Sequence, residues 1–175
     1  LSHIYTSSWQ RHPSRISGTL PADLFRGCPT LCRLIAHKRD AQRALEPGLE
    51  LSGTLPAALS PLADFQDLRL GYNRLSGTIP AEFSGLTRLE LRVNKDISGT
   101  LPKHARAHYL GLGSTALSGT IPTSIARGLT HLSLEETGIS GTLPHLLDAP
   151  ALTTLRVGYS QLSGTIPQIN GSVWL

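Results

Sequence analysis

The feature that most constrains this chain is the pentapeptide Ser-Gly-Thr-(Leu/Ile)-Pro, which occurs seven times in 175 residues. Apart from a first interval of 35 residues, successive copies begin 20 to 24 residues apart. A period of this length indicates a solenoid, in which each repeat forms one layer and packs only against its neighbours. The copies begin at Ser17, Ser52, Ser76, Ser98, Ser118, Ser140 and Ser163.

A second pattern, L-x-x-L-x-L-x-x-N-x-L, precedes the pentapeptides and is clearest from Phe65 to Leu75. The L-x-L segment has the period of a β-strand, so its leucines face the core and the x residues lie on the exposed face. We therefore expect seven parallel strands. Burial of each leucine side chain should stabilise the fold by about 1.5–3 kcal/mol. The leucines expected to be buried are Leu68, Leu70, Leu89, Leu91, Leu110, Leu112, Leu132, Leu134 and Leu155.

The Asn of this pattern is present only at Asn73 and Asn94, and Thr115, Thr137 and Ser160 replace it in later copies. We expect the replacing hydroxyl groups, or water, to take over the hydrogen bonds that Asn would make to neighbouring loops.

The first repeats are the least regular. Residues 1–6 are expected to form the first strand through Leu1, Ile4 and Thr6, and Leu31, Leu34 and Ala36 the second. An insertion near 40–50, roughly Asp40 to Glu50, contains Pro-Gly and should project as a loop. We expect residues 1–175 to form a single segment of about seven repeats. Because no Cys-containing cap is evident at either end, we expect this segment to belong to a longer chain or its ends to be covered by a partner.

Each pentapeptide should begin the return to the convex side of the solenoid. Pro ends strand pairing and Gly permits a turn. The segments that follow are expected to form short helical or 3-10 turns, at Ala22–Phe25, Ala81–Phe83 and Thr123–Ile125.

The two patterns together resemble the plant-specific class of leucine-rich repeats, found in receptor-kinase ectodomains, polygalacturonase-inhibiting proteins and some plant antifreeze proteins. The resemblance implies an α/β repeat fold: a leucine-rich-repeat solenoid with a curved parallel sheet on the concave face, a second short flanking sheet, and short helical or 3-10 turns on the convex side. It also implies an extracellular or cell-surface location, with which the glycosylation sequon at Asn170 agrees.

Composition narrows the function. The chain has a net charge of +4, and only 16% of its residues are charged. Its sequence contains no dense Lys/Arg block, which argues against nucleic acid as a partner. The sequence has no run of eighteen apolar residues, so we predict no membrane span in this segment. Cys28 and Cys32 are too few for a disulfide scaffold, and both a local disulfide and two free thiols remain open.

No constellation of residues favours catalysis. Among the seven histidines only His104 and His108 have metal-like spacing, and the repeat register places them on different sides of a layer. The neighbours Glu135 and Glu136 should point in different directions and remain solvated. We therefore predict no catalytic residue, no metal and no cofactor, and a non-catalytic binding module rather than an enzyme.

The outward strand positions carry cations and aromatic rings, which are common anchors at protein interfaces. These residues favour a protein or peptide partner, and an acidic partner would suit the arginines. We expect the chain to act as a receptor ectodomain, an inhibitor or an assembly subunit. Glu90, His131 and Glu135 are expected on the same exposed face. The candidate binding residues are Arg33, His37, Lys38, Arg69, Tyr72, Arg88, Arg92, Tyr109, Arg156 and Tyr159.

An alternative uses the Thr of every pentapeptide. Stacked repeats are expected to align these residues into a ladder at the strand spacing of about 4.8 Å, and such an array would suit ice or glycan binding. Thr is also favoured on any exposed strand, and duplicated repeats would inherit it. The ladder residues are Thr19, Thr54, Thr78, Thr100, Thr120, Thr142 and Thr165.

Overall fold

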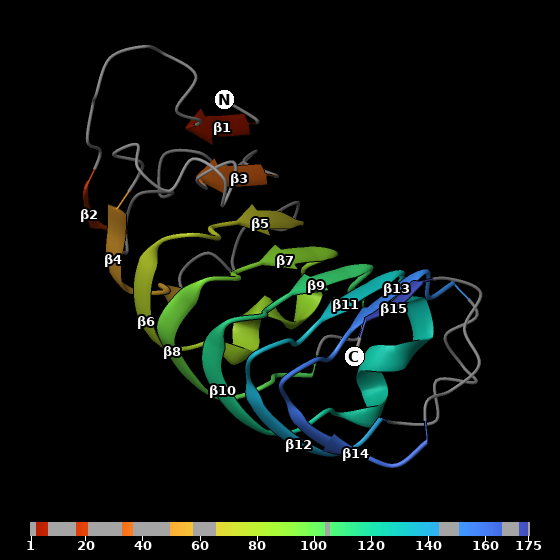
Figure 1. The fold of residues 1–175 in the computed structure, drawn as a ribbon. Helices are drawn as coiled ribbons and strands as arrows, with labels where there is room; N and C mark the ends of the chain where they lie inside the picture. Colours follow the sequence, from red (N-terminus) through yellow and green to blue (C-terminus); the bar gives the residue numbers. More distant parts are fainter. Residues whose placement is uncertain are drawn as a thin grey trace.

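The computed structural model of the chain describes residues 3–6, 17–20, 33–36, 50–57, 66–103, 106–143, 151–165 and 172–174. These residues form a curved solenoid with two parallel sheets, one along each side of the stack (Figure 1). The predicted leucine-rich-repeat architecture is confirmed.

The sheet on the concave face contains eight strands, one more than expected. The additional strand, β15, lies beside β13 and pairs Val173 with Leu155. It was missed because no pentapeptide follows it, although Ser-Val-Trp continues the alternation. In sheet order the strands are β1 (His3–Thr6), β3 (Arg33–Ala36), β5 (Asp67–Arg69), β7 (Arg88–Glu90), β9 (Tyr109–Gly111), β11 (His131–Ser133), β13 (Thr154–Arg156) and β15 (Ser172–Trp174).

The flanking sheet contains seven strands, and each includes the Ser of one pentapeptide. Glu50 belongs to β4, so the insertion ends before this residue, and residues 40–49 lie outside the described part. The strands are β2 (Ser17–Thr19), β4 (Glu50–Thr54), β6 (Arg74–Thr78), β8 (Asn94–Thr100), β10 (Thr115–Thr120), β12 (Gly138–Thr142) and β14 (Gln161–Ser163).

The pentapeptide glycines hold this second sheet together. Gly53 has φ +85°, in the region that favours glycine, and a Cβ built on it would lie 2.8 Å from Cγ2 of Thr19. The Ser76 hydroxyl donates to the Gly53 carbonyl oxygen at 3.4 Å, and Ser140 donates to Gly119 at 3.3 Å. A Ser hydroxyl group thus bonds each of these pentapeptides to the preceding one. The Thr methyl group of one pentapeptide covers the glycine of the following pentapeptide.

Short 3-10 helices form on the convex side, as predicted. Two are described, η3 (Ala81–Gly85) and η4 (Thr123–Gly128), and they bury Phe83 and Ile125. The turn predicted at Ala22–Phe25 lies outside the described residues. Within the described part of the chain, no helix has the length and apolar character that crossing a membrane requires.

Leucines from successive repeats form one continuous core. All nine strand leucines that were expected to be buried, from Leu68 to Leu155, have no exposed surface. The predicted register of the concave sheet is therefore confirmed.

The Asn position links neighbouring layers. The Asn94 side-chain amide donates to the carbonyl oxygens of Leu70 and Leu91 at 3.0 and 2.7 Å, and its oxygen accepts from the Leu75 amide at 3.0 Å. The replacing residue Thr115 donates to Leu112 at 2.7 Å, which reproduces the bond to the carbonyl three residues earlier. This bond lies within one repeat, so replacement of the bonds to neighbouring loops stays a prediction.

We predict that Leu110→Ala lowers the free energy of unfolding by about 2–5 kcal/mol, because it leaves a cavity between two packed layers. The half-buried Leu162, near the end of the flanking sheet, is the matched control, and its change to Ala should cost less. Chemical denaturation measures both. Equal losses would contradict the described core.

We predict that Asn94→Ala destabilises the protein more than Asn94→Thr. Alanine leaves a buried amide and two carbonyl groups without this partner, at about 1–3 kcal/mol for each unsatisfied group. Threonine should retain the bond to the Leu91 carbonyl, as Thr115 does in the next repeat. Thermal unfolding of the two variants gives the order, and a more stable alanine variant would refute it.

Candidate binding site on the concave face

The parallel register arranges the outward residues of the concave sheet in columns. One column runs through Arg33, Asp67, Arg88, Tyr109 and His131, which pair in succession across β3, β5, β7, β9 and β11. The next contains Arg69, Glu90, Gly111 and Ser133. Residues that are twenty or more positions apart in the sequence therefore become neighbours.

Asp67 pairs with two of these arginines. Its carboxylate lies 2.8 Å from Nε of Arg33, and the Arg69 guanidinium donates to both of its oxygens at 2.9 Å. Only 7% of Asp67 is exposed. The aspartate thus holds two cations at the edge of the concave face and offsets part of their charge.

Glu90 lies flat in the middle of the site. It is 8% exposed, and its Oε1 is 3.2 Å from Nε of Arg92, an ion pair without an aligned hydrogen bond. A Cβ added to Gly111 would lie 2.6 Å from Oε2 of Glu90. The absence of a side chain at Gly111 therefore gives the carboxylate its space.

Two arginines lie against aromatic rings. The Arg88 guanidinium carbon is 3.8 Å from the centroid of the Tyr109 ring, and that of Arg92 is 5.0 Å from the Tyr72 ring. Such cation–π contacts hold a guanidinium in place without neutralising it. Among the described residues, no carboxylate forms an ion pair with Arg88.

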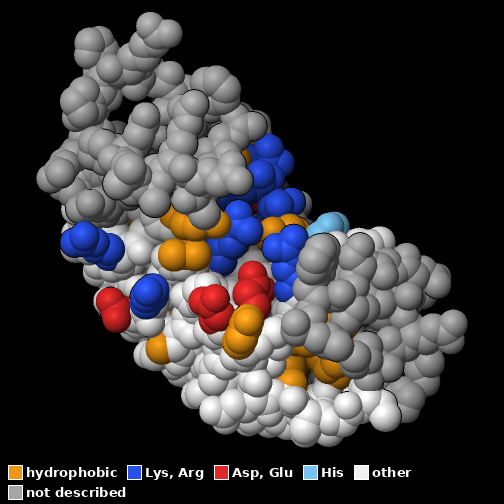
Figure 2. All heavy atoms as spheres, viewed as in Figure 1, with side chains coloured by type: hydrophobic (Ala, Val, Ile, Leu, Met, Phe, Trp, Pro, Cys, Tyr) orange, Lys and Arg blue, Asp and Glu red, His pale blue; other side chains and the backbone are white. Residues whose placement is uncertain are grey.

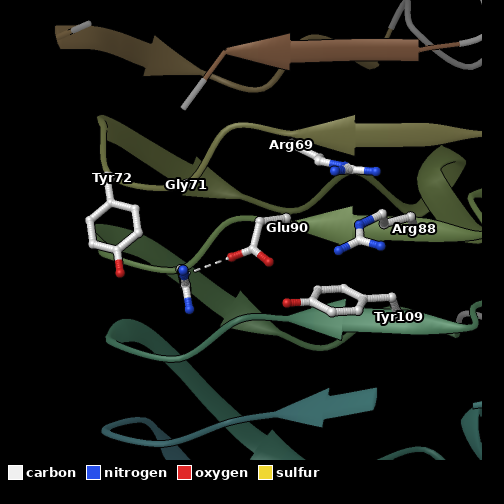
Figure 3. Close-up of a pocket in the computed structure, with 7 residues that line it drawn as sticks. Arg69, Gly71, Tyr72, Arg88, Glu90 and Tyr109 are labelled. Atoms are coloured by element: carbon white, nitrogen blue, oxygen red, sulfur yellow. Dashed lines mark ion pairs between the residues drawn. The ribbon is translucent and has the colours of Figure 1, made fainter. Parts of the chain in front are cut away.

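These side chains surround an open hollow of about 160 Å³. Glu90 extends towards its centre, with Arg69, Arg88 and the Tyr109 ring on one side and Tyr72 on the other (Figure 3). Lys and Arg side chains gather in a band on this face of the molecule (Figure 2). The hollow is lined by Arg69, Gly71, Tyr72, Arg88, Glu90, Arg92 and Tyr109.

The charges of the site do not balance. The cations are Arg33, Arg69, Arg88 and Arg92, and the anions are Asp67 and Glu90; four positive and two negative charges leave a net charge of +2. The hollow can therefore accept an anion, while its carboxylates limit how closely one approaches Glu90.

Burial raises the pKa of Tyr109 above its usual value. The negative charge of Glu90 and a side-chain hydrogen bond to it raise this pKa further, whereas Arg88 and Arg92 lower it. At neutral pH Tyr109 is therefore a neutral hydrogen-bond donor that helps to position Glu90.

Only some of the predicted binding residues lie in the hollow. Arg69, Arg88, Arg92, Tyr72 and Tyr109 meet in the hollow, as described above. Tyr72 does so from a turn with φ +58° rather than from a strand.

The remaining predicted residues lie elsewhere. Arg33 is beside the hollow, bonded to Asp67. Arg156 is exposed on β13, and Tyr159 follows in a turn and is 90% exposed. His37, Lys38 and the glycosylation candidate Asn170 lie outside the described residues.

Two residues of the site were not recognised or were misread from sequence. Glu90 was expected to be exposed, but it is buried because Gly71 and Gly111 leave room for its carboxylate. Asp67 occupies the x position directly before the first leucine of the L-x-L segment, and this place in the pattern is the signal that could have identified it.

The Thr residues of the pentapeptides do not align directly. Thr19 pairs with Ser52 and Thr54 with Ser76, so each Thr lies beside the Ser two positions before the next Thr. The expected side-by-side ladder is therefore wrong: successive Thr residues are displaced by about 6–7 Å along the strands. All seven are exposed.

A parallel two-sheet solenoid with buried L-x-L leucines is a leucine-rich-repeat solenoid, and residues 64–86 match the Leucine Rich Repeat family. The BIR2 ectodomain from Arabidopsis thaliana is 30% identical, with a TM-score of 0.55 over 67% of this chain and 69% of that chain. The chain belongs to the plant-type leucine-rich-repeat family.

Two further structures are similar. The Arabidopsis receptor kinase HAESA, solved with the peptide hormone IDA and the co-receptor SERK1, is 32% identical, with a TM-score of 0.73 over 87% of this chain. The chain spans 25% of the length of the receptor chain in that structure. A plant ice-binding protein has a TM-score of 0.69 over 98% of this chain and 63% of its own, but at 19% identity it shows the fold alone.

We predict that Tyr109 ionises above the usual pH range of a tyrosine, and that Tyr109→Phe removes this late transition. Glu90→Gln should lower the pKa of Tyr109, because it removes the negative charge that opposes formation of tyrosinate. Absorbance at alkaline pH follows the ionisation. An unchanged late transition in Tyr109→Phe would contradict the assignment.

Proposed function

We propose that this chain is a non-catalytic binding module whose concave face takes an acidic peptide or an acidic segment of a protein. The observation that carries the proposal is the hollow over β5 and β7, which has a net charge of +2 and contains Arg88 without a carboxylate partner among the described residues. Arg88 is also held in place by Tyr109, so the site is organised before a ligand arrives.

Electrostatics explains why such a ligand would bind. Guanidinium groups gathered on one face repel one another, and Asp67 and Glu90 relieve only part of this repulsion. A ligand carboxylate placed against Arg88 would relieve more of it and could gain paired hydrogen bonds, which a lysine in this position would not reproduce. Tyr72 and Tyr109 add apolar surface beside the cations.

The similarity to HAESA supports a peptide or protein as the partner, because that receptor was solved with a peptide hormone and a co-receptor. Action as part of a receptor ectodomain, as an inhibitor or as a subunit of an assembly is compatible with the proposal. An extracellular or cell-surface location is part of the same proposal.

The structure gives less support to the alternative of ice or glycan binding. The seven Thr residues are exposed, but neighbouring Thr residues are stepped along the strands instead of lying side by side. Their methyl groups also cover the glycines of the next repeat, which gives the repeated Thr a packing role.

We predict that Arg69→Glu with Arg88→Glu weakens binding of a glutamate-rich peptide by about tenfold at low salt, which corresponds to about 1.4 kcal/mol. Association should slow and its dependence on salt should flatten, since charges on an interface act mainly on encounter. An acetylated and amidated ten-residue peptide of alternating Glu and Gly is a suitable probe in fluorescence anisotropy.

The matched control is Lys95→Glu, which changes an exposed cation on β8 of the flanking sheet. It should leave the affinity for the probe within about twofold. Circular dichroism confirms that each variant is folded. If the double reversal and the control affect affinity equally, the concave face is not the binding site.

A further inference from the structure

Charge changes sign along the concave face. The basic hollow lies over β5 and β7, whereas Glu135 and Glu136 follow β11, two strands further along the sheet. Neither glutamate forms an ion pair with a cation of the described residues. The face therefore presents a positive region at the hollow and a negative region after β11.

Both glutamates are held by hydroxyl groups rather than by cations. Ser133 donates to the Glu135 carboxylate from the same segment, and Ser114 donates to Glu136 at 2.8 Å. A hydrogen bond from a hydroxyl group orients a carboxylate and leaves its negative charge in place. Arg156 on β13 borders this region on the side away from the hollow.

After Tyr109, the strand between the two regions has only glycine at its outward positions, and carboxylates from the neighbouring repeats lie over them. These glycines are Gly111 and Gly113, and both are buried. A Cβ on Gly113 would lie 2.5 Å from the Glu135 carboxyl carbon, so the glycine allows this side chain to lie flat towards the hollow. Glu90 lies over Gly111 in the same way.

Backbone pairing places a residue of the positive region and a residue of the negative region in the same column of the sheet. The Val93 amide donates to the Gly113 carbonyl oxygen at 3.0 Å, and the Ser114 amide donates to that of Glu135 at 2.7 Å. The residues before Val93 and Ser114 are Arg92 and Gly113, so Arg92, Gly113 and Glu135 occupy one column. A ligand that crosses the strands along this column meets a cation and then an anion.

We propose that the concave face is a charge-polarised track for an extended peptide that carries one acidic and one basic residue about three residues apart. The acidic side chain lies against Arg88 and Arg92, and the basic side chain lies against Glu135. This proposal rests on the proposed function and specifies its ligand. The order of the two charged residues in the peptide determines which way the peptide lies along the solenoid.

Strand geometry determines the spacing. From β7 to β11 there are two strand intervals of about 4.8 Å, or roughly 10 Å, and an extended chain advances about 3.3 Å per residue. Three peptide residues therefore connect the two regions. The strands β7, β9 and β11 have only three residues each, which gives a track about 10 Å wide, suited to a single extended chain.

The test compares three acetylated and amidated eight-residue peptides. The first has Glu and Lys three positions apart in a Gly-Ser background, the second has them adjacent, and the third has Glu in place of Lys. Binding of each to the 175-residue protein is measured by nuclear magnetic resonance titration at low salt. We expect the first peptide to bind up to about fivefold more tightly than either of the others.

The variant Glu135→Gln with Glu136→Gln should remove the advantage of the first peptide over the third without weakening the third. Glu82→Gln, which changes an exposed glutamate on η3, is the matched control and should preserve the advantage. Glu135→Arg should reverse the preference, so that the peptide with two Glu residues binds best. Far-ultraviolet circular dichroism verifies folding.

The two proposals fail in different ways. If the peptide with two Glu residues binds wild type as tightly as the first peptide, the polarised track is refuted and the basic site survives. Equal binding of the adjacent and spaced pairs refutes the three-residue spacing and with it the track. If none of the peptides binds at low salt, both the track and the basic binding face are refuted.

Discussion

Burial of the strand leucines is the interaction on which the other features depend. Leu68, Leu89 and Leu110 pair across successive strands with no exposed surface, so a shift of one residue would place them in solvent. This penalty determines the register of the concave sheet. The register in turn gathers Arg69, Arg88 and residues far from them in sequence into columns.

Glycine serves two physically different purposes in the same repeats. In the pentapeptide, Gly53 has a positive φ and lies under a Thr methyl group, so both its conformation and its size matter. On the concave face, Gly111 and Gly113 have no such φ, and only their size matters because carboxylates lie over them. The first use stabilises the stack, and the second shapes the charged surface.

Much of the architecture follows from periodicity, because leucine positions and pentapeptides repeat in a pattern that only a stacked sheet can bury. The gathering of Arg69, Arg88 and Arg92 could be predicted for the same reason. Their partners could not: the direction in which Glu90 turns depends on the space left by glycines in neighbouring repeats. The step between Thr residues likewise depends on the pairing register of the flanking sheet, in which each Thr lies beside the Ser of the next pentapeptide.

The proposed recognition of an acidic ligand depends on partial neutralisation of this face. If every guanidinium were paired as Arg69 is with Asp67, an arriving anion would compete with ion pairs that already exist. If none were paired, mutual repulsion would oppose the close packing seen around Glu90 and Arg92. Two carboxylates among four arginines lie between these limits, and Arg88, supported by the Tyr109 ring, keeps its charge available. The same glycine-supported placement of Glu135 puts an opposite charge within reach of one extended ligand.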